Sequence, residues 1–218
     1  VRSGHRRGGT CPPDRTAPAV TLPDSTQALQ NAVRGMKRGI PKDYFTTGGI
    51  NADVEKAVQE GIRSLESLGM QTVEVSRPHL DYAVATYYII ACAEASTNLS
   101  RYDGVKYGYR ADKSDTLVHM YENTREEGFG EEVKRRIILG TFVLSSGYYD
   151  AYYLKGQKVR TLIKQDFENA LGQCDVIAAP VTPYPAFKLG EKLDDPLQMD
   201  LADIFTIDRK ITRLNSSH

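Results

Sequence analysis

The chain has 218 residues, of which 40% are hydrophobic and 26% are charged, and these fractions exclude collagen-like and strongly disordered chains. Its 28 basic residues balance its 28 acidic residues, so no net charge draws it to nucleic acid or to anionic lipid. Cys11, Cys92 and Cys174 form no C-x-x-C pair, which predicts reduced thiols in a cytosol-like compartment and no disulfide. No apolar run approaches the roughly 18 residues that a membrane-spanning helix needs.

The first elements predicted along the chain are a strand, a helix and a second strand. Residues 36–40 form a short strand that Pro41 ends, and residues 71–76 alternate between polar and apolar as a strand does. Between them, Asn51 is placed to cap a helix whose apolar residues fall on one line. We predict that this line is buried; it consists of Val54, Val58, Gly61, Leu65 and Leu68. The order strand, helix, strand favours a parallel crossover unit.

Helices dominate the rest of the chain. Apolar spacing predicts helices over residues 79–99, 114–127, 130–144 and 148–171, then a strand over 175–179 and a helix after Pro196. We therefore expect one α/β domain over residues 27–207. Residues 1–26 and 208–218 lack apolar spacing that would let them pack. We predict that both ends are disordered, or foreign to the natural protein, and that they make few contacts.

Signatures of metal, phosphate and nucleophile chemistry are absent from the chain. The four histidines stand alone, so no metal site is expected, and there is no glycine-rich phosphate-binding motif. The Ser145-Ser146-Gly147 triplet has no histidine or lysine placed to act as its base. It lies where one predicted helix gives way to the next, which favours a structural role. The sequence thus predicts no catalytic residue within the chain.

An arginine pair in the 130–144 helix is the most informative polar feature. Arg136 lies about 60° from the apolar line of that helix, whereas Arg135 points away from it. A guanidinium at the edge of a buried face is suited to bidentate binding of a carboxylate. That carboxylate belongs either to the protein or to a ligand, and the residues alone favour a structural salt bridge.

Five strings of the sequence, in order and spacing, resemble one branch of the amidase-signature family, the A subunits of tRNA-dependent amidotransferases. They are GMKRGIPKDYF (35–45), ATYYIIACAEASTNLSRYDGVKYGYR (85–110), EEGFGEEVKRR (126–136), SSGYYDAYYLKGQKVRTLI (145–163) and LGEKLDDPLQM (189–199). The resemblance covers most of residues 27–207. It implies an α/β amidase-signature fold, with a central mixed sheet covered by helices.

The resemblance also implies a reaction and its participants. In this family a serine attacks the carboxamide of glutamine, a second serine relays the proton and a lysine serves as base. The released ammonia passes to a B subunit, which uses ATP and Mg²⁺ to amidate Glu-tRNA(Gln) or Asp-tRNA(Asn). The implied partners are thus the B and C subunits, glutamine, and tRNA mainly through the B subunit. No cofactor is implied for the chain itself, and the location is cytoplasmic or an organellar matrix.

Carried over residue by residue, the resemblance assigns three positions to the binding of glutamine. Arg136 corresponds to the residue that binds the α-carboxylate, Asp203 to the one that binds the α-ammonium group, and Tyr87 to a residue of the pocket wall. Taken without the resemblance, Asp203 is an exposed helix carboxylate and Tyr87 is a core aromatic residue.

The chain departs from the family at the position of its catalytic signature. No Gly/Ser-rich segment with two serines, and no lysine ahead of such a segment, is present in these residues. We therefore predict that the chain is an internal-to-C-terminal fragment that is inactive alone. Two other hypotheses stay open: a segment of a stand-alone amidase-signature amidohydrolase, and a non-catalytic helical interaction module.

Overall fold

The computed structural model describes residues 26–27, 32–46, 49–191, 199 and 201–213. Its sheet has three strands in the order β2-β1-β3, with β1 (Lys37–Pro41) between β2 (Gln71–Val75) and β3 (Val176–Ile177). Both pairings are parallel. The expectation of a mixed sheet is therefore wrong for the strands that the structure describes. Helices separate β1 from β2 and β2 from β3 along the chain. Such a crossover brings the chain back to the end of the sheet where the previous strand began, which makes the strands parallel.

The predicted crossover unit is confirmed. Between β1 and β2 the chain forms α1 (Asp43–Thr46) and α2 (Ala52–Ser67), with Asn51 as the N-cap of α2. The Asn51 Oδ1 accepts a 2.8 Å hydrogen bond from the backbone N–H of Asp53. Gly69, with φ of +94°, follows α2 and lets the chain turn into β2.

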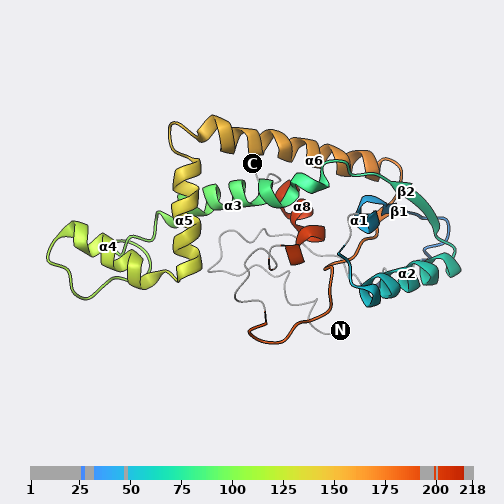
Figure 1. The fold of residues 1–218 in the computed structure, drawn as a ribbon, viewed down its shortest axis with the longest axis horizontal. Coiled ribbons are helices and arrows are strands. Elements are labelled where there is room, and N and C mark those ends of the chain that lie inside the picture. Colours follow the sequence, from blue (N-terminus) through green and yellow to red (C-terminus); the bar gives the residue numbers. More distant parts are fainter. Residues whose placement is uncertain (1–25, 28–31, 47–48, 192–198, 200, 214–218) are drawn as a thin grey trace.

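The apolar line of α2, by contrast, is not buried. None of the residues of α2 is buried, the side chain of Leu68 is 62% exposed, and Gly61 faces open space. Figure 1 shows α2 beside the sheet, at the opposite end of the molecule from α4. A three-stranded sheet offers too little surface to cover the whole line, so the prediction of burial is wrong for the described chain.

The main core forms around α3 (Ala83–Leu99), which follows the short 3-10 helix η3 (Leu80–Tyr82). Three helices pack against α3: α5 (Glu131–Val143), α6 (Lys155–Leu171) and α8 (Ile204–Arg213). Figure 1 shows α3 lying along α6, with α8 below it. The core cluster contains Tyr44, Leu80, Ala83, Ile163, Phe205, Ile207 and Ile211.

Two helices approach α3 through glycines. A Cβ atom built on Gly140 of α5 would lie 2.0 Å from the carbonyl oxygen of Cys92, and one on Gly156 of α6 would lie 3.2 Å from Ile89 Cγ2. The backbones of α3 and α5 therefore come closer together than any other residue type at position 140 allows. Cys92 and Cys174 are buried free thiols, as predicted for these two; Cys11 lies outside the described residues.

The predicted break after α5 is also present. The Ser145 hydroxyl donates to the carbonyl oxygen of Phe142 at 2.7 Å, which satisfies an end group of α5 as expected for a structural serine. A π-helical turn, η4 (Tyr149–Leu154), then leads into α6. None of the described helices is long and apolar enough to cross a membrane.

The end of the described chain corrects the prediction that residues from 208 onward make few contacts. Asp208 belongs to α8, is fully buried, and pairs with Arg77 at 2.6 Å, and the hydroxyl of Tyr44 donates to it at 2.8 Å. Ile211, one turn after Ile207, is also fully buried. The i, i+4 spacing of these two isoleucines continues the apolar face of α8, and Arg77 neutralises the buried carboxylate. Residues 214–218 lie outside the described residues, as do residues 1–25.

Candidate functional site

Arg136 lies on α5 where this helix crosses α3. Its Nε donates to Glu132 Oε1 at 2.7 Å, and its guanidinium carbon is 5.8 Å from the centroid of the Tyr88 ring. Its side chain is 31% exposed, against 53% for Arg135, so the helical phase separated the two arginines correctly. The hydrogen bond to Glu132, together with a hydrogen bond to Tyr87, holds the pKa of Arg136 above its usual range.

Glu132, in the first turn of α5, binds both arginines. Its Oε2 accepts from Arg135 Nε at 2.8 Å, and its Oε1 accepts from Arg135 Nη2 at 2.9 Å and from Arg136 Nε at 2.7 Å. The carboxylate is thus held bidentately by Arg135 and at one oxygen by Arg136. The hydrogen bonds from Arg135 and then Arg136 lower the pKa of Glu132 to about 2.

Tyr87 lies in the first half of α3. It is half-buried, packs against the main core cluster, and stands edge-to-face with Tyr88 at a centroid distance of 5.8 Å. The Tyr87 hydroxyl lies near enough to Arg136 to contribute to the raised pKa of that arginine. Two of the three residues that the family resemblance assigns to glutamine therefore lie near each other.

Asp203 directly precedes α8 and is exposed. Its backbone carbonyl accepts from the backbone N–H groups of Thr206 and Ile207, both at 2.8 Å, so the residue begins the helix. Its carboxylate is 3.5 Å from Lys210 Nζ of the same helix. Among the ion pairs of the described residues, none joins Asp203 to Arg136. What relates the two residues is that α5 and α8 both pack on α3.

The sequence reasoning missed Glu132 and Tyr88. A signal for Glu132 existed, because it precedes Arg135 by three residues and Arg136 by four, and both spacings bring side chains together on a helix. Nothing in the pattern distinguished this carboxylate from Glu131. That neighbour pairs with Lys134 at 2.5 Å and is 91% exposed.

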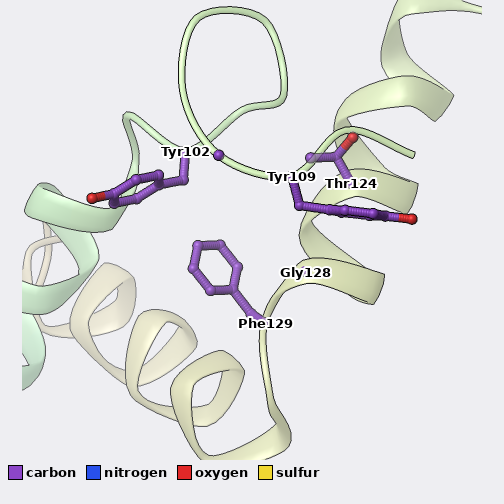
Figure 2. Close-up of a pocket in the computed structure, with 6 residues that line it drawn as sticks. Tyr102, Tyr109, Thr124, Gly128 and Phe129 are labelled. Carbon is purple, nitrogen blue, oxygen red and sulfur yellow. The ribbon is translucent and has the colours of Figure 1, made fainter. Parts of the chain in front are cut away.

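A separate cavity of about 220 Å³ lies between α4 (Leu117–Gly128) and the loop that precedes this helix. Figure 2 shows the Phe129 ring below and between Tyr102 and Tyr109, whose hydroxyl groups point away from each other. The Tyr109 hydroxyl donates to Glu127, and the guanidinium carbon of Arg125 is 5.1 Å from the Phe129 ring centroid. The residues that line this cavity supply aromatic surface but neither a carboxylate nor an amine; they are Tyr102, Gly108, Tyr109, Thr124, Gly128 and Phe129.

Comparison with known proteins decides the family. The family model described as Amidase matches residues 8–216, which is most of the chain. This chain belongs to the amidase family. It is similar to the A subunits of the glutamyl-tRNA(Gln) amidotransferases of Desulfatibacillum aliphaticivorans (56% identical over 199 residues) and of Geobacter sulfurreducens (57% over 199 residues). In each case the match covers 91% of this chain and 41% of the relative, so the chain spans about two fifths of their length.

Solved structures of the amidase family agree with the fold. In the crystal structure from Thermotoga maritima, the A subunit of glutamyl-tRNA(Gln) amidotransferase is 39% identical, with a TM-score of 0.59 over 83% of this chain and 34% of that chain. A crystal structure of an amidase gives a TM-score of 0.61 at 20% identity, over 84% of this chain and 37% of that one, which shows a shared fold alone. The expected amidase-signature fold of α/β class is thereby confirmed.

The shared carboxylate of Glu132 leads to a prediction for this amidase-family chain. Its pKa of about 2 lies below the ordinary value of 4.5, so its ion pairs stabilise the folded state fully above pH 4.5. That stabilisation is lost as the pH falls from 4.5 through 2, because the unfolded chain then binds the proton more readily. A carbon-13 NMR titration of the Glu132 carboxyl group should give a midpoint near 2. In an Arg135→Gln, Arg136→Gln variant the midpoint should rise toward 4.5, and an unchanged midpoint would contradict the assignment of its cause.

Proposed function

We propose that this chain is part of the glutaminase subunit of an amidotransferase that acts on misacylated Glu-tRNA(Gln) or Asp-tRNA(Asn). The observation that carries the proposal is the 56–57% identity to the A subunits of glutamyl-tRNA(Gln) amidotransferases over 199 residues. Likeness to amidases at 20% identity or less supports the fold and carries no argument about substrate.

In this proposal the chain supplies binding groups for glutamine rather than the groups that break its amide bond. Arg136 binds the α-carboxylate, because a guanidinium fork matches the two oxygens of a carboxylate. Tyr87, which contacts Arg136, forms the adjacent wall, and Asp203 binds the α-ammonium group. A cationic group on α5 and an anionic group on α8 suit an amino acid that carries both charges.

In this proposal the amide bond of glutamine is cleaved by a serine nucleophile, a second serine and a lysine base. These residues lie in or ahead of a Gly/Ser-rich segment outside these 218 residues. Ammonia then passes to a B subunit, which uses ATP and Mg²⁺, and a C subunit completes the assembly. The glutaminase subunit itself holds no cofactor, and the location is the cytoplasm or an organellar matrix. The balanced charge of the chain supports this division of labour, since tRNA is then bound mainly by the B subunit.

Sequencing the locus in both directions is the first test. The proposal requires a Gly/Ser-rich segment with two serines upstream, in the frame of residue 27, and the same reading decides whether residues 1–26 and 208–218 belong to the natural protein. The product of the complete gene, assembled with its B and C subunits, should release ammonia from glutamine and convert Glu-tRNA(Gln) or Asp-tRNA(Asn) to the amidated form. Hydrolysis of simple amides without any use of glutamine would support the stand-alone amidase instead, and a gene with no such segment would support the interaction module.

A further inference from the structure

The first turn of α5 has an arrangement that two independent surface ion pairs would not produce. Glu132 is shared: Arg135 holds both of its oxygens, and Arg136 reaches one of them through Nε alone. A bidentate pair fixes the carboxylate in position and orientation, because two parallel hydrogen bonds stop it from rotating. Glu132 is therefore a fixed acceptor for Arg136.

The contact through Nε determines which way Arg136 points. An arginine has donors on Nε and on the two terminal nitrogens of its fork, in fixed planar geometry. Glu132 occupies Nε, and among the hydrogen bonds and ion pairs of the described residues none joins a terminal nitrogen of Arg136 to a carboxylate. The Tyr88 ring, 5.8 Å from the guanidinium carbon, restricts the plane of the Arg136 side chain further. With Nε bonded to Glu132 and at most one terminal N–H shared with Tyr87, the remaining donors of Arg136 are left for another acceptor.

We propose that Glu132 is a positioning residue for substrate, which aims the guanidinium of Arg136 at the α-carboxylate, and that Arg135 serves only to hold Glu132. This inference rests on the proposed function, since it takes glutamine to be the ligand of Arg136. It explains why two adjacent arginines share one glutamate: Arg135 fixes Glu132, and Glu132 orients Arg136. Neither Glu132 nor Arg135 touches the reacting amide.

Glu132→Ala in the product of the complete gene, assembled with its partner subunits, tests the inference. Freed from Glu132, Arg136 samples several rotamers and loses part of its binding energy for the carboxylate. That binding is the same in the ground state and the transition state, so we expect KM for glutamine to rise about tenfold with kcat nearly unchanged. Glu132→Gln keeps an oxygen acceptor for Arg136 Nε, and its KM should lie between those of the parent and the alanine variant.

Glu131→Ala is the matched control. It removes a glutamate from the same helical turn, but Glu131 pairs with Lys134 and does not contact either arginine in the described ion pairs. We expect its KM for glutamine to equal that of the parent. Amidation of the misacylated tRNA with added ammonium salt provides a second control, because this reaction does not use glutamine. The rate of this ammonium-dependent amidation should be the same in Glu132→Ala and in the parent.

A truncated substrate separates positioning from a merely structural effect. 4-Aminobutanamide is glutamine without its α-carboxylate, so a residue that acts through that carboxylate has no influence on it. Glu132→Ala and the parent should therefore hydrolyse 4-aminobutanamide with equal kcat/KM. An equal loss on both substrates, or an unchanged KM for glutamine, would overturn the positioning role while leaving the proposed function intact. If the parent assembly fails to use glutamine at all, the proposed function fails and this inference fails with it.

Discussion

Arg136→Lys, made in the product of the complete gene, should lower kcat/KM for glutamine by about 100-fold. An ammonium group cannot present two parallel donors to a carboxylate. Lysine also lacks an Nε–H, so Glu132 cannot hold its side chain in one orientation while the ammonium group binds the ligand. Lysine also lacks the planar guanidinium group, whose carbon lies 5.8 Å from the centroid of the Tyr88 ring in Arg136. Steady-state release of ammonia from glutamine, measured by a coupled assay, gives both kinetic constants.

Arg135→Lys is the control for this substitution, because it makes the same chemical change at the adjacent position. Lysine at position 135 keeps a cation three residues after Glu132 and so keeps that carboxylate paired, although through one donor instead of two. We expect a loss of about threefold or less. Equal losses in the two variants would show that Arg136 is no more than a structural partner of Glu132, and would refute its assignment to glutamine.

The orientation of this arginine pair was predictable from sequence because each residue of a helix points in a direction set by its position along the helix. Residues 135 and 136 differ by one step of about 100° on α5, and only the second lies near the line of Val133, Ile137 and Gly140 that meets α3. The role of Glu132 was not predictable in the same way. A glutamate followed by arginines at three and four residues is common on solvated helix surfaces, and only the structure shows that Arg135 binds both oxygens of Glu132.

Burial was predicted less well than periodicity. The apolar line of α2 was located correctly but lies half exposed, because periodicity says which residues share a face and nothing of whether a partner covers that face. The opposite error occurred at Asp208. A carboxylate read as part of a polar tail is fully buried because Arg77, distant in sequence, pairs with it. The three site residues show the same limit, since the helical phase of Arg136 was readable and the packing of both α5 and α8 on α3 was not.

Gly140→Ala should cause the largest loss of stability of any change proposed for this chain. The added Cβ would lie 2.0 Å from the carbonyl oxygen of Cys92 and 2.6 Å from its carbonyl carbon, which are backbone atoms that no side-chain rotation can move aside. The helices α3 and α5 must then separate, which opens the contact around the buried side chains of Cys92 and Val143. We expect the free energy of unfolding to fall by about 3 kcal/mol, even though alanine favours a helix more than glycine does.

Gly61→Ala is the matched substitution on α2, where a new Cβ meets no atom within 4 Å. With no clash to oppose it, the helix propensity of alanine should stabilise the chain by about 0.5–1 kcal/mol. Urea unfolding followed by circular dichroism measures both variants on one scale. Opposite signs for the same Gly→Ala change would establish that contact with α3, rather than helix propensity, decides the residue at position 140. If Gly140→Ala were as stable as the parent, the close approach of α3 and α5 would be wrong. The position of Arg136, one turn before Gly140 on the same helix, would then need a different explanation.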